Sequence, residues 1–428
     1  MKIHCYIEPD RSFWKQLCAR PEAKKEDIGK EVREILETVR SKGDSAVLAY
    51  EERFDGVSLS EGLKVTREEI SEAETLVGES LKGAIRTASG NIRRFHEAQI
   101  PSPVKVETSP GVVCIQKAVP INRVGLYVPG GRAPLFSTVL MLAIPAKVAG
   151  CPEVVLCTPP GPDGRINPAI LYAASVCGVE DIYKIGGAQA IAAMAYGTES
   201  VPRCDKIAGP GNRYVTKAKQ LVSESVAIDM PAGPSEVMVL ADDSANPVFV
   251  AADFLSQSEH GPDSQSILIC SSHRMVASIM NEARIQFPSL ERKEDIVQSL
   301  LHSRVVVLMD RGSMVDFANL YAPEHLIINM ENPWEIADGI RTAGSVFIGP
   351  WTPESAGDYA SGTNHTLPTG GWARSMGGLC VDTFLRKMTI QELTEDGLRG
   401  IGNVILEMAK EEGLTAHAAS VSYRIGEQ

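Results

Sequence analysis

Four of the eight histidines lie in polar, turn-rich segments in the second half of the chain, where a histidine side chain could do chemistry. They are His260, His325, His365 and His417. The other four lie in charged helical or flanking segments of ordinary composition: His4, His96, His273 and His302. Histidine changes charge near neutral pH and is the commonest metal ligand. The first four are therefore the candidates for proton transfer or metal binding.

The segment LSQSEHGPDSQ suggests a metal site. Gln257 and His260 are three residues apart, so they share one face at the end of a helix. Asp358 in AGDYASGTNH and His417 in EEGLTAH could complete a set of two imidazoles, one carboxylate and one amide oxygen. Such a mixed set suits zinc, with manganese or cobalt as alternatives, and leaves room for a substrate to coordinate. Because no HExxH motif is present, the competing interpretation of His260 is a surface histidine near a helix end.

In YAPEHL, an acid and a base are adjacent at the mouth of a predicted strand: Glu324 and His325. Neighbouring side chains of a strand point in opposite directions, so each can serve a different proton instead of neutralising the other. A solvated charged turn is the alternative. We favour a catalytic pair.

Four glycine-rich turns follow predicted strands: VPGGRAP, IGGAQA, AGPGNRY and PAGPSE. Turns of this kind let backbone amides and helix N-termini approach a phosphate-bearing ligand. Neither GxGxxG nor a P-loop is present, so a dinucleotide would have to bind without the usual fingerprint. The alternative is that glycine and proline only end the strands.

The elements that must position these residues form two series. From Val124, short β-rich runs alternate with amphipathic stretches, and the pattern restarts after AGPSE. This alternation predicts an α/β fold with two doubly wound, Rossmann-like parallel sheets, whose ligands bind at the carboxyl ends of the strands. The first hundred residues are expected to be helical, with a capping box at Thr66 and Glu69. Two short strands are expected around Pro110-Gly111, and a long functional loop after Gly349 precedes a helical tail from Thr394.

Composition excludes several classes of protein. With 42 basic and 54 acidic residues the formal charge is −12, which argues against a nucleic-acid binder. No apolar run approaches the roughly 18 residues of a membrane span, and the start has no signal-peptide h-region. The nine cysteines are odd in number and form no CxxC pair, which argues against a disulfide framework or a cysteine zinc site. We expect a cytoplasmic protein.

Taken in order, eight motifs resemble the histidinol dehydrogenase family: YVPGGRAP, GGAQAIAAMAYGT, GPGN, DMPAGPSEV, LSQSEHGPDSQ, YAPEHL, TPESAGDYASGTNHTLPT and EGLTAH. The resemblance covers nearly the whole chain from Val124. We expect an N-terminal helical segment (1–22), a main α/β domain (23–123 with 236–380), an inserted Rossmann-like NAD-binding domain (124–235) and a C-terminal tail that reaches the partner subunit (381–428).

The resemblance implies a zinc-dependent, NAD-linked oxidation of L-histidinol through L-histidinal to L-histidine, the last step of histidine biosynthesis. His325 would carry the proton transfers from substrate oxygen, and Glu324 would activate water. One zinc ion per subunit would be held by Gln257, His260, Asp358 and His417. The substrate would contact these four residues, His325 and three further positions: Ser235, His365 and Glu412. NAD, the co-substrate, would contact Tyr127, Gln189 and Asn212.

The family resemblance also implies a homodimer in which each tail completes the partner's active site. Two other classes remain open. A zinc hydrolase could use the same four ligands with Glu324 as base, but it would not need four glycine-rich strand ends and would not reduce NAD. A non-catalytic binding protein is the third reading, and the adjacent Glu324 and His325 argue against it.

Overall fold

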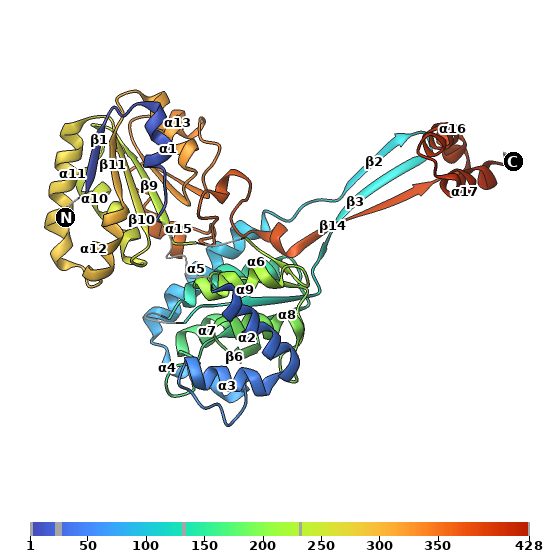
Figure 1. The fold of residues 1–428 in the computed structure, drawn as a ribbon, viewed down its shortest axis with the longest axis horizontal. Coiled ribbons are helices and arrows are strands. Elements are labelled where there is room, and N and C mark those ends of the chain that lie inside the picture. Colours follow the sequence, from blue (N-terminus) through green and yellow to red (C-terminus); the bar gives the residue numbers. More distant parts are fainter. Residues whose placement is uncertain (1–2, 22–27, 131–133, 231–232, 427–428) are drawn as a thin grey trace.

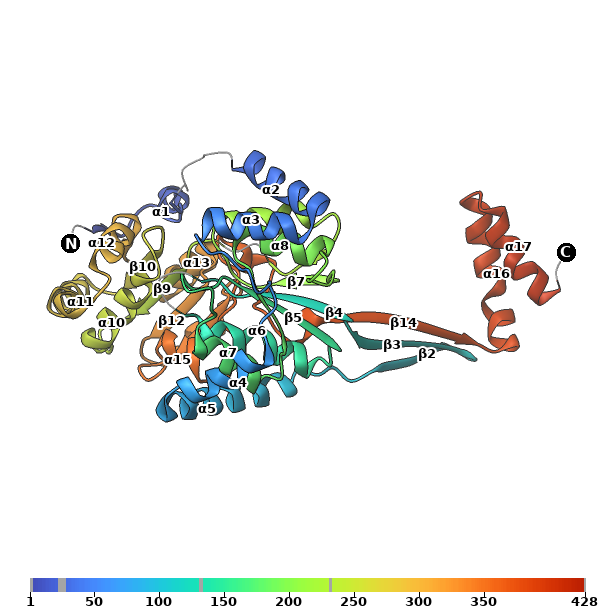
Figure 2. The ribbon, with the colours of Figure 1, turned by 90° about the horizontal axis from the view of Figure 1, so that it is seen from below.

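The computed structural model describes residues 3–21, 28–130, 134–230 and 233–426. Figures 1 and 2 show two helix-covered sheets beside each other and an arm that projects away from both. Within the described residues, no helix is both long and apolar enough to cross a membrane.

The first body is a six-stranded parallel sheet with the order β1-β11-β10-β9-β12-β13. Its strands are β1 (His4–Ile7), β9 (Glu236–Ala241), β10 (Gln265–Cys270), β11 (Arg304–Val307), β12 (His325–Asn329) and β13 (Ser345–Ile348). One face is covered by α10 (Pro247–Ser256), α11 (His273–Gln286) and α12 (Lys293–His302). The other is covered by α1 (Trp14–Leu17), α13 (Arg311–Tyr321) and α14 (Pro333–Ala337). The short helix α15 (Glu354–Tyr359) follows β13.

The second body is a five-stranded parallel sheet with the order β6-β5-β4-β7-β8. Its strands are β4 (Arg123–Tyr127), β5 (Glu153–Thr158), β6 (Asp181–Lys184), β7 (Lys206–Ala208) and β8 (Ala227–Ile228). One face packs on α4 (Arg67–Leu76), α5 (Glu79–Glu97), α6 (Phe136–Val148) and α7 (Pro168–Val176). The other packs on α2 (Gly29–Lys42), α3 (Asp44–Phe54), α8 (Gly187–Tyr196) and α9 (Arg213–Val222).

The arm is a three-stranded antiparallel sheet that ends in a pair of helices. Its strands, in the order β14-β3-β2, are β2 (Val104–Ser109), β3 (Val112–Pro120) and β14 (Leu385–Leu393). The helices are α16 (Glu395–Glu411) and α17 (Thr415–Ile425). Both views place this pair at the far end of the arm, away from the two parallel sheets (Figures 1 and 2).

Most of the expected pattern is confirmed. Both parallel sheets are present, and the expected strands correspond to β4–β13. Thr66 and Glu69 form the capping box of α4, with hydrogen bonds of 3.1 and 2.9 Å. Thr394 caps α16, and β2 and β3 flank the turn at Pro110-Gly111. The long segment after Gly349 also contains α15, and it leads into β14, which the sequence did not suggest.

The packing of the N-terminal elements differs from the expected grouping. Residues 23–123 were expected to join residues 236–380, yet α2–α5 cover the five-stranded sheet, where the apolar stripe of α2 is buried against α8 and α9. The segment 1–22 is not only helical, because β1 pairs in parallel with β11 and extends the six-stranded sheet. A four-residue edge strand carries too little periodicity to stand out in the sequence.

A buried ion pair fixes the GPGN turn at the carboxyl end of β7. Lys219 of α9 pairs with Asp229, and both side chains are almost fully buried, at 4% and 1% exposure. Lys219 Nζ donates to the Gly209 carbonyl oxygen (2.9 Å), and the Gly209 N–H donates to Asp229 Oδ2 (2.7 Å). Gly209 has φ +130°, and a Cβ there would overlap the Tyr127 carbonyl oxygen. The turn therefore requires glycine and is held by two opposite charges.

Replacing Asp229 with alanine should lower the free energy of unfolding by about 3–5 kcal/mol, because it leaves the Lys219 ammonium buried without its partner. Urea denaturation followed by circular dichroism would measure the change. Asp181→Ala is the matched control, since it breaks the Lys64–Asp181 pair, whose side chains are about half exposed, and should cost about 0–1 kcal/mol. Equal losses in the two variants would contradict a special role for the buried pair.

Candidate active site

Glu324 and His325 lie at the start of β12, directly after the turn that follows α13. Ala322, which caps α13, has a left-handed backbone (φ 55°), so the chain reverses sharply before Glu324. Both side chains are buried, at 6% and 3% exposure. They occupy the amino end of the strand. The rule that ligands bind at the carboxyl ends of parallel strands therefore does not describe this part of the site.

The main chain of Glu236 orients both residues. β9 and β12 run in parallel with Val237 opposite His325. The Glu236 N–H donates to Glu324 Oε2 (2.8 Å), and His325 Nδ1 lies 3.1 Å from the Glu236 carbonyl oxygen. Since a carbonyl oxygen can only accept, Nδ1 carries the proton in this bond. His325 Nε2, which has no hydrogen-bond partner, is 3.6 Å from Asp358 Oδ1.

Carboxylates surround His325. Glu324 Oε2 lies 3.6 Å and Glu354 Oε1 3.7 Å from His325 Nδ1. Burial alone would lower the pKa of His325, but Glu354, Glu324 and Asp358 together raise it to about 10. Burial raises the pKa of the Glu324 carboxyl to about 8, against the opposing effect of His325. The pair can therefore hold protons that an exposed glutamate and histidine would release.

Three side chains near His325 form a potential metal site. One ligand atom from each of His260, Glu354 and Asp358 lies within 4.8 Å of the others. In a zinc site, bonds of about 2.0–2.2 Å bring the donor atoms to about 3.5 Å from one another. Small movements of these three side chains would therefore suffice to bind the ion. Gln257 is fully buried beside them. In the amide orientation that satisfies both partners, its nitrogen donates to Glu354 Oε2 (3.1 Å) and its oxygen accepts from the Glu236 N–H (3.0 Å). The donor chemistry fits zinc.

Glu354 was not among the expected site residues. It lies four residues before Asp358 in TPESAGDY, and this spacing places both carboxylates on one face of α15. The same spacing argument that was applied to Gln257 and His260 could have found it. Its burial raises the pKa of the Glu354 carboxyl to about 8.

The remaining expected substrate residues divide into two groups. His365 is half-buried, its Nδ1 lies 3.0 Å from the Asp358 carbonyl oxygen, and its Nε2 lies 3.3 Å from Thr138 Oγ1. Ser235 immediately precedes Glu236, so both lie beside the cluster. Glu412 and His417 instead lie at the end of α16 and in α17, exposed and in the arm away from the cluster (Figure 1). Within one chain, Glu412 and His417 therefore lie far from the other candidate site residues.

The three expected NAD contacts line one cavity of about 960 Å³ at the carboxyl ends of β4–β7. The Gly187 N–H donates to the Tyr127 hydroxyl (3.0 Å), and Asn212 Oδ1 caps α9 through the N–H groups of Tyr214 and Val215 (2.9 and 3.1 Å). Gln189 Nε2 donates to Glu51 Oε1 (2.9 Å). Parts of two glycine-rich turns, residues 131–133 and 231–232, lie outside the described residues.

Glu51 is a second residue that sequence reasoning missed. It is fully buried on α3, and its Oε1 also accepts from the Gly186 N–H (3.0 Å). Burial raises the pKa of the Glu51 carboxyl to about 7, and Asp55, which lines the cavity, adds to the effect. No sequence signal links α3 to the IGGAQA turn, because the contact spans more than a hundred residues.

Comparisons with known proteins agree over the full length. The histidinol dehydrogenase family model matches residues 18–425. A histidinol dehydrogenase of Bacteroides thetaiotaomicron is 56% identical over 426 residues, 99% of this chain and of that protein. One from Bacteroides fragilis is 54% identical over 428 residues, 100% of this chain and 99% of that protein. The crystal structure of histidinol dehydrogenase from Elizabethkingia anophelis is similar with a TM-score of 0.97 and 49% identity, covering 99% of this chain and 98% of that one. The chain therefore belongs to the histidinol dehydrogenase family.

Proposed function

We propose that the protein oxidises L-histidinol through L-histidinal to L-histidine with NAD as hydride acceptor, the last step of histidine biosynthesis. The observation that carries the proposal is the buried Glu324–His325 pair beside His260, Glu354 and Asp358. An acid–base pair next to potential metal ligands suits the oxidation of an alcohol whose imidazole and amino nitrogens can coordinate a metal. The enzyme works in the cytoplasm, in keeping with its nine free cysteines.

His325 transfers the proton from the substrate hydroxyl. With Nδ1 committed to the Glu236 carbonyl oxygen, Nε2 is the nitrogen available to substrate. In the first half-reaction, the neutral form of His325 accepts the alcohol proton at this nitrogen as hydride leaves carbon, and the surrounding carboxylates stabilise the imidazolium that results. In the second half-reaction, Glu324 removes a proton from the water that attacks the aldehyde carbon, and a second hydride then leaves.

Gln257, His260 and Asp358 of one chain, with His417 of the tail, would hold the zinc ion. When bound, zinc supplies positive charge that orients the substrate through its imidazole and amino nitrogens. Glu354 holds the amide of Gln257. Ser235, His365 and Glu412 would contact the substrate. The cavity lined by Tyr127, Gln189 and Asn212 would take NAD. Each half-reaction would use its own NAD molecule, which accepts one hydride.

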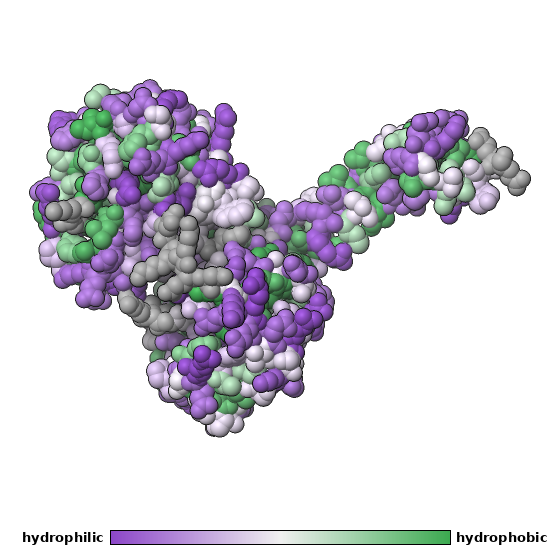
Figure 3. All heavy atoms as spheres, in the orientation of Figure 1, coloured by the Kyte–Doolittle hydropathy of each residue, from purple (hydrophilic) through white to green (hydrophobic). Residues whose placement is uncertain are grey.

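We propose a homodimer in which each tail enters the partner's site. The proposal is supported by the position of Glu412 and His417, which are exposed at the end of the arm (Figure 2). No other part of the described chain packs over that end. The arm also exposes large apolar side chains, and Figure 3 shows hydrophobic residues on its visible face. They are Val104, Val106, Ile390, Leu393, Val404, Met408, Leu414 and Tyr423, all at least 36% exposed. Apolar surface of this extent on a thin projection is typical of a surface that packs against another chain.

Glu324→Gln should slow the conversion of added L-histidinal more than the oxidation of L-histidinol to the aldehyde, because only aldehyde conversion needs an activated water. A general base typically contributes about 100- to 10,000-fold. NADH formation from each substrate measures the two steps. Glu331→Gln, an exposed glutamate beyond the other end of β12, is the control and should leave both rates unchanged. Equal losses in both steps would remove Glu324 from the water-activating role.

His260→Ala and Asp358→Ala should each lower bound zinc and NADH formation together, since each removes one of the ligands and leaves the others misplaced. Zinc analysis of the purified variants, beside NADH assays before and after chelation and zinc addition, measures both. His273→Ala changes an exposed histidine of α11 and should keep its zinc. Full zinc content in either site variant would exclude that residue as a ligand.

Mixing inactive His417→Ala and His260→Ala subunits under exchange conditions should restore activity. A shared site predicts one intact site per mixed dimer, formed by the body of the first variant and the tail of the second. As a control, His417→Ala mixed with Glu412→Ala should stay inactive, because both defects lie on tails. Mass analysis verifies the mixed dimers. Mixed dimers of the first pair that remain inactive would show that each tail serves its own chain.

A further inference from the structure

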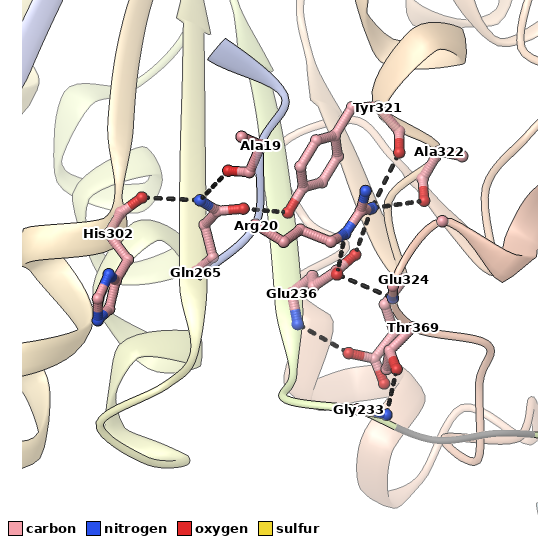
Figure 4. Close-up of polar contacts among 12 residues, drawn as sticks. Ala19, Arg20, Gly233, Glu236, Gln265, His302, Tyr321, Ala322, Glu324 and Thr369 are labelled. Atoms are coloured by element: carbon pink, nitrogen blue, oxygen red, sulfur yellow. Dashed lines mark hydrogen bonds and ion pairs between the residues drawn. The ribbon is translucent and has the colours of Figure 1, made fainter. Parts of the chain in front are cut away.

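Arg20, in the segment that follows α1, makes several polar contacts near the catalytic pair without being part of it. Its guanidinium forms a two-pronged ion pair with Glu236, through Nε to Oε1 and through Nη2 to Oε2 (2.9 Å). Nη2 also donates to the carbonyl oxygens of Tyr321 (2.9 Å) and Ala322 (3.3 Å). The guanidinium carbon lies 4.1 Å from the centre of the Tyr321 ring. Figure 4 shows all these contacts converging on one side chain.

These contacts join the two segments that orient the catalytic pair. Glu236 offers its N–H to Glu324 and its carbonyl oxygen to His325. Tyr321 ends α13, and Ala322 has the left-handed backbone of the turn that leads to Glu324. Arg20 therefore fixes the strand on one side of the pair and the turn on the other.

The surrounding contacts keep this arrangement in place. The Glu236 carboxylate also accepts from the Gly370 N–H (2.9 Å), and its side chain is only 4% exposed. Gln265 of β10 accepts from the Tyr321 hydroxyl (2.7 Å) and donates to the Ala19 carbonyl oxygen (3.2 Å). The residue before Arg20 and the ring beneath it are thus tied to the same glutamine (Figure 4).

We propose that Arg20 and Glu236 are positioning residues of this enzyme: their ion pair sets the main-chain groups that hold Glu324 and His325 in register. The inference rests on the roles proposed for that pair. The planar guanidinium is needed because it meets both carboxylate oxygens, two carbonyl groups and an aromatic face at once, which a lysine ammonium cannot do.

Arg20→Lys and Glu236→Gln should each lower kcat by about 10- to 100-fold, the loss expected when reacting groups are displaced by up to 1 Å. The KM for NAD and the zinc content should remain as in the unchanged protein. Both half-reactions should fall together, because the pair loses its alignment as a unit, in contrast to the selective loss expected for Glu324→Gln. Rates are measured with saturating L-histidinol and with L-histidinal, after thermal melts have given the folded fraction.

Arg11→Lys is the matched control. Arg11 comes from the same N-terminal segment and also pairs with α13, through Asp316 at 2.8 Å, but both side chains are more than half exposed. It should leave kcat unchanged. In Arg20→Ala, added guanidinium at millimolar concentration should restore part of kcat by filling the vacated position, with no gain in the unchanged protein or in Arg11→Ala.

Three results would overturn the proposal. The first is wild-type kcat in Arg20→Lys and Glu236→Gln. The second is a loss that only follows the folded fraction, which would make the ion pair structural. The third is a loss confined to one half-reaction. Failure of the proposed role of Glu324 is separately visible, because it appears in Glu324→Gln as unaltered rates or as equal losses in both half-reactions, whatever the Arg20 variants do.

Discussion

The parallel pairing of β9 with β12 is the constraint on which the site depends. Val237 lies opposite His325, and this register places the peptide groups of Glu236 beside Glu324 and His325. A shift of one residue would turn every side chain of β12 to the other face of the sheet. Both the tautomer of His325 and the orientation of Glu324 are therefore consequences of strand register. The buried apolar side chains of β9 and β12 maintain that register, because both strands are covered on both faces.

The charge of the cluster is unbalanced. Three carboxyl groups, those of Glu324, Glu354 and Asp358, lie around the imidazole of His325 in a mostly buried space. His260 and His365 adjoin Asp358. Such a group of acids is electrostatically costly to bury, and the raised pKa values of Glu324 and Glu354 reflect that cost. A divalent cation beside Asp358 would stabilise the ionised forms of these carboxyl groups, so a cluster that is costly to ionise in the protein alone favours metal binding.

Sequence patterns predicted the repeating parts of the fold well. Buried parallel strands are short apolar runs, and the amphipathic helices between them have a clear period, so β4–β13 were identified from the sequence. The edge strands β1 and β14 were missed, because half-exposed strands have a weak pattern. The candidate pair and the proposed metal-ligating segment were predicted from residue type and spacing. Arg20, Glu236 and Glu51 were not, since their contacts join segments more than a hundred residues apart, and single-sequence spacing carries no information at that range.

The placement of β1 affects the order in which the chain can fold during synthesis. All strands of the five-stranded sheet have been made once residue 228 has been made, whereas β1, at residues 4–7, pairs with β11, at residues 304–307. Contacts so distant in sequence close late, because the intervening chain must first be ordered. β1, although made long before its partner, therefore stays unpaired until β11 has been made. The contacts of Arg20 with Tyr321 and Ala322 likewise need residues that are made after β11, so the part of the site that Arg20 holds forms late.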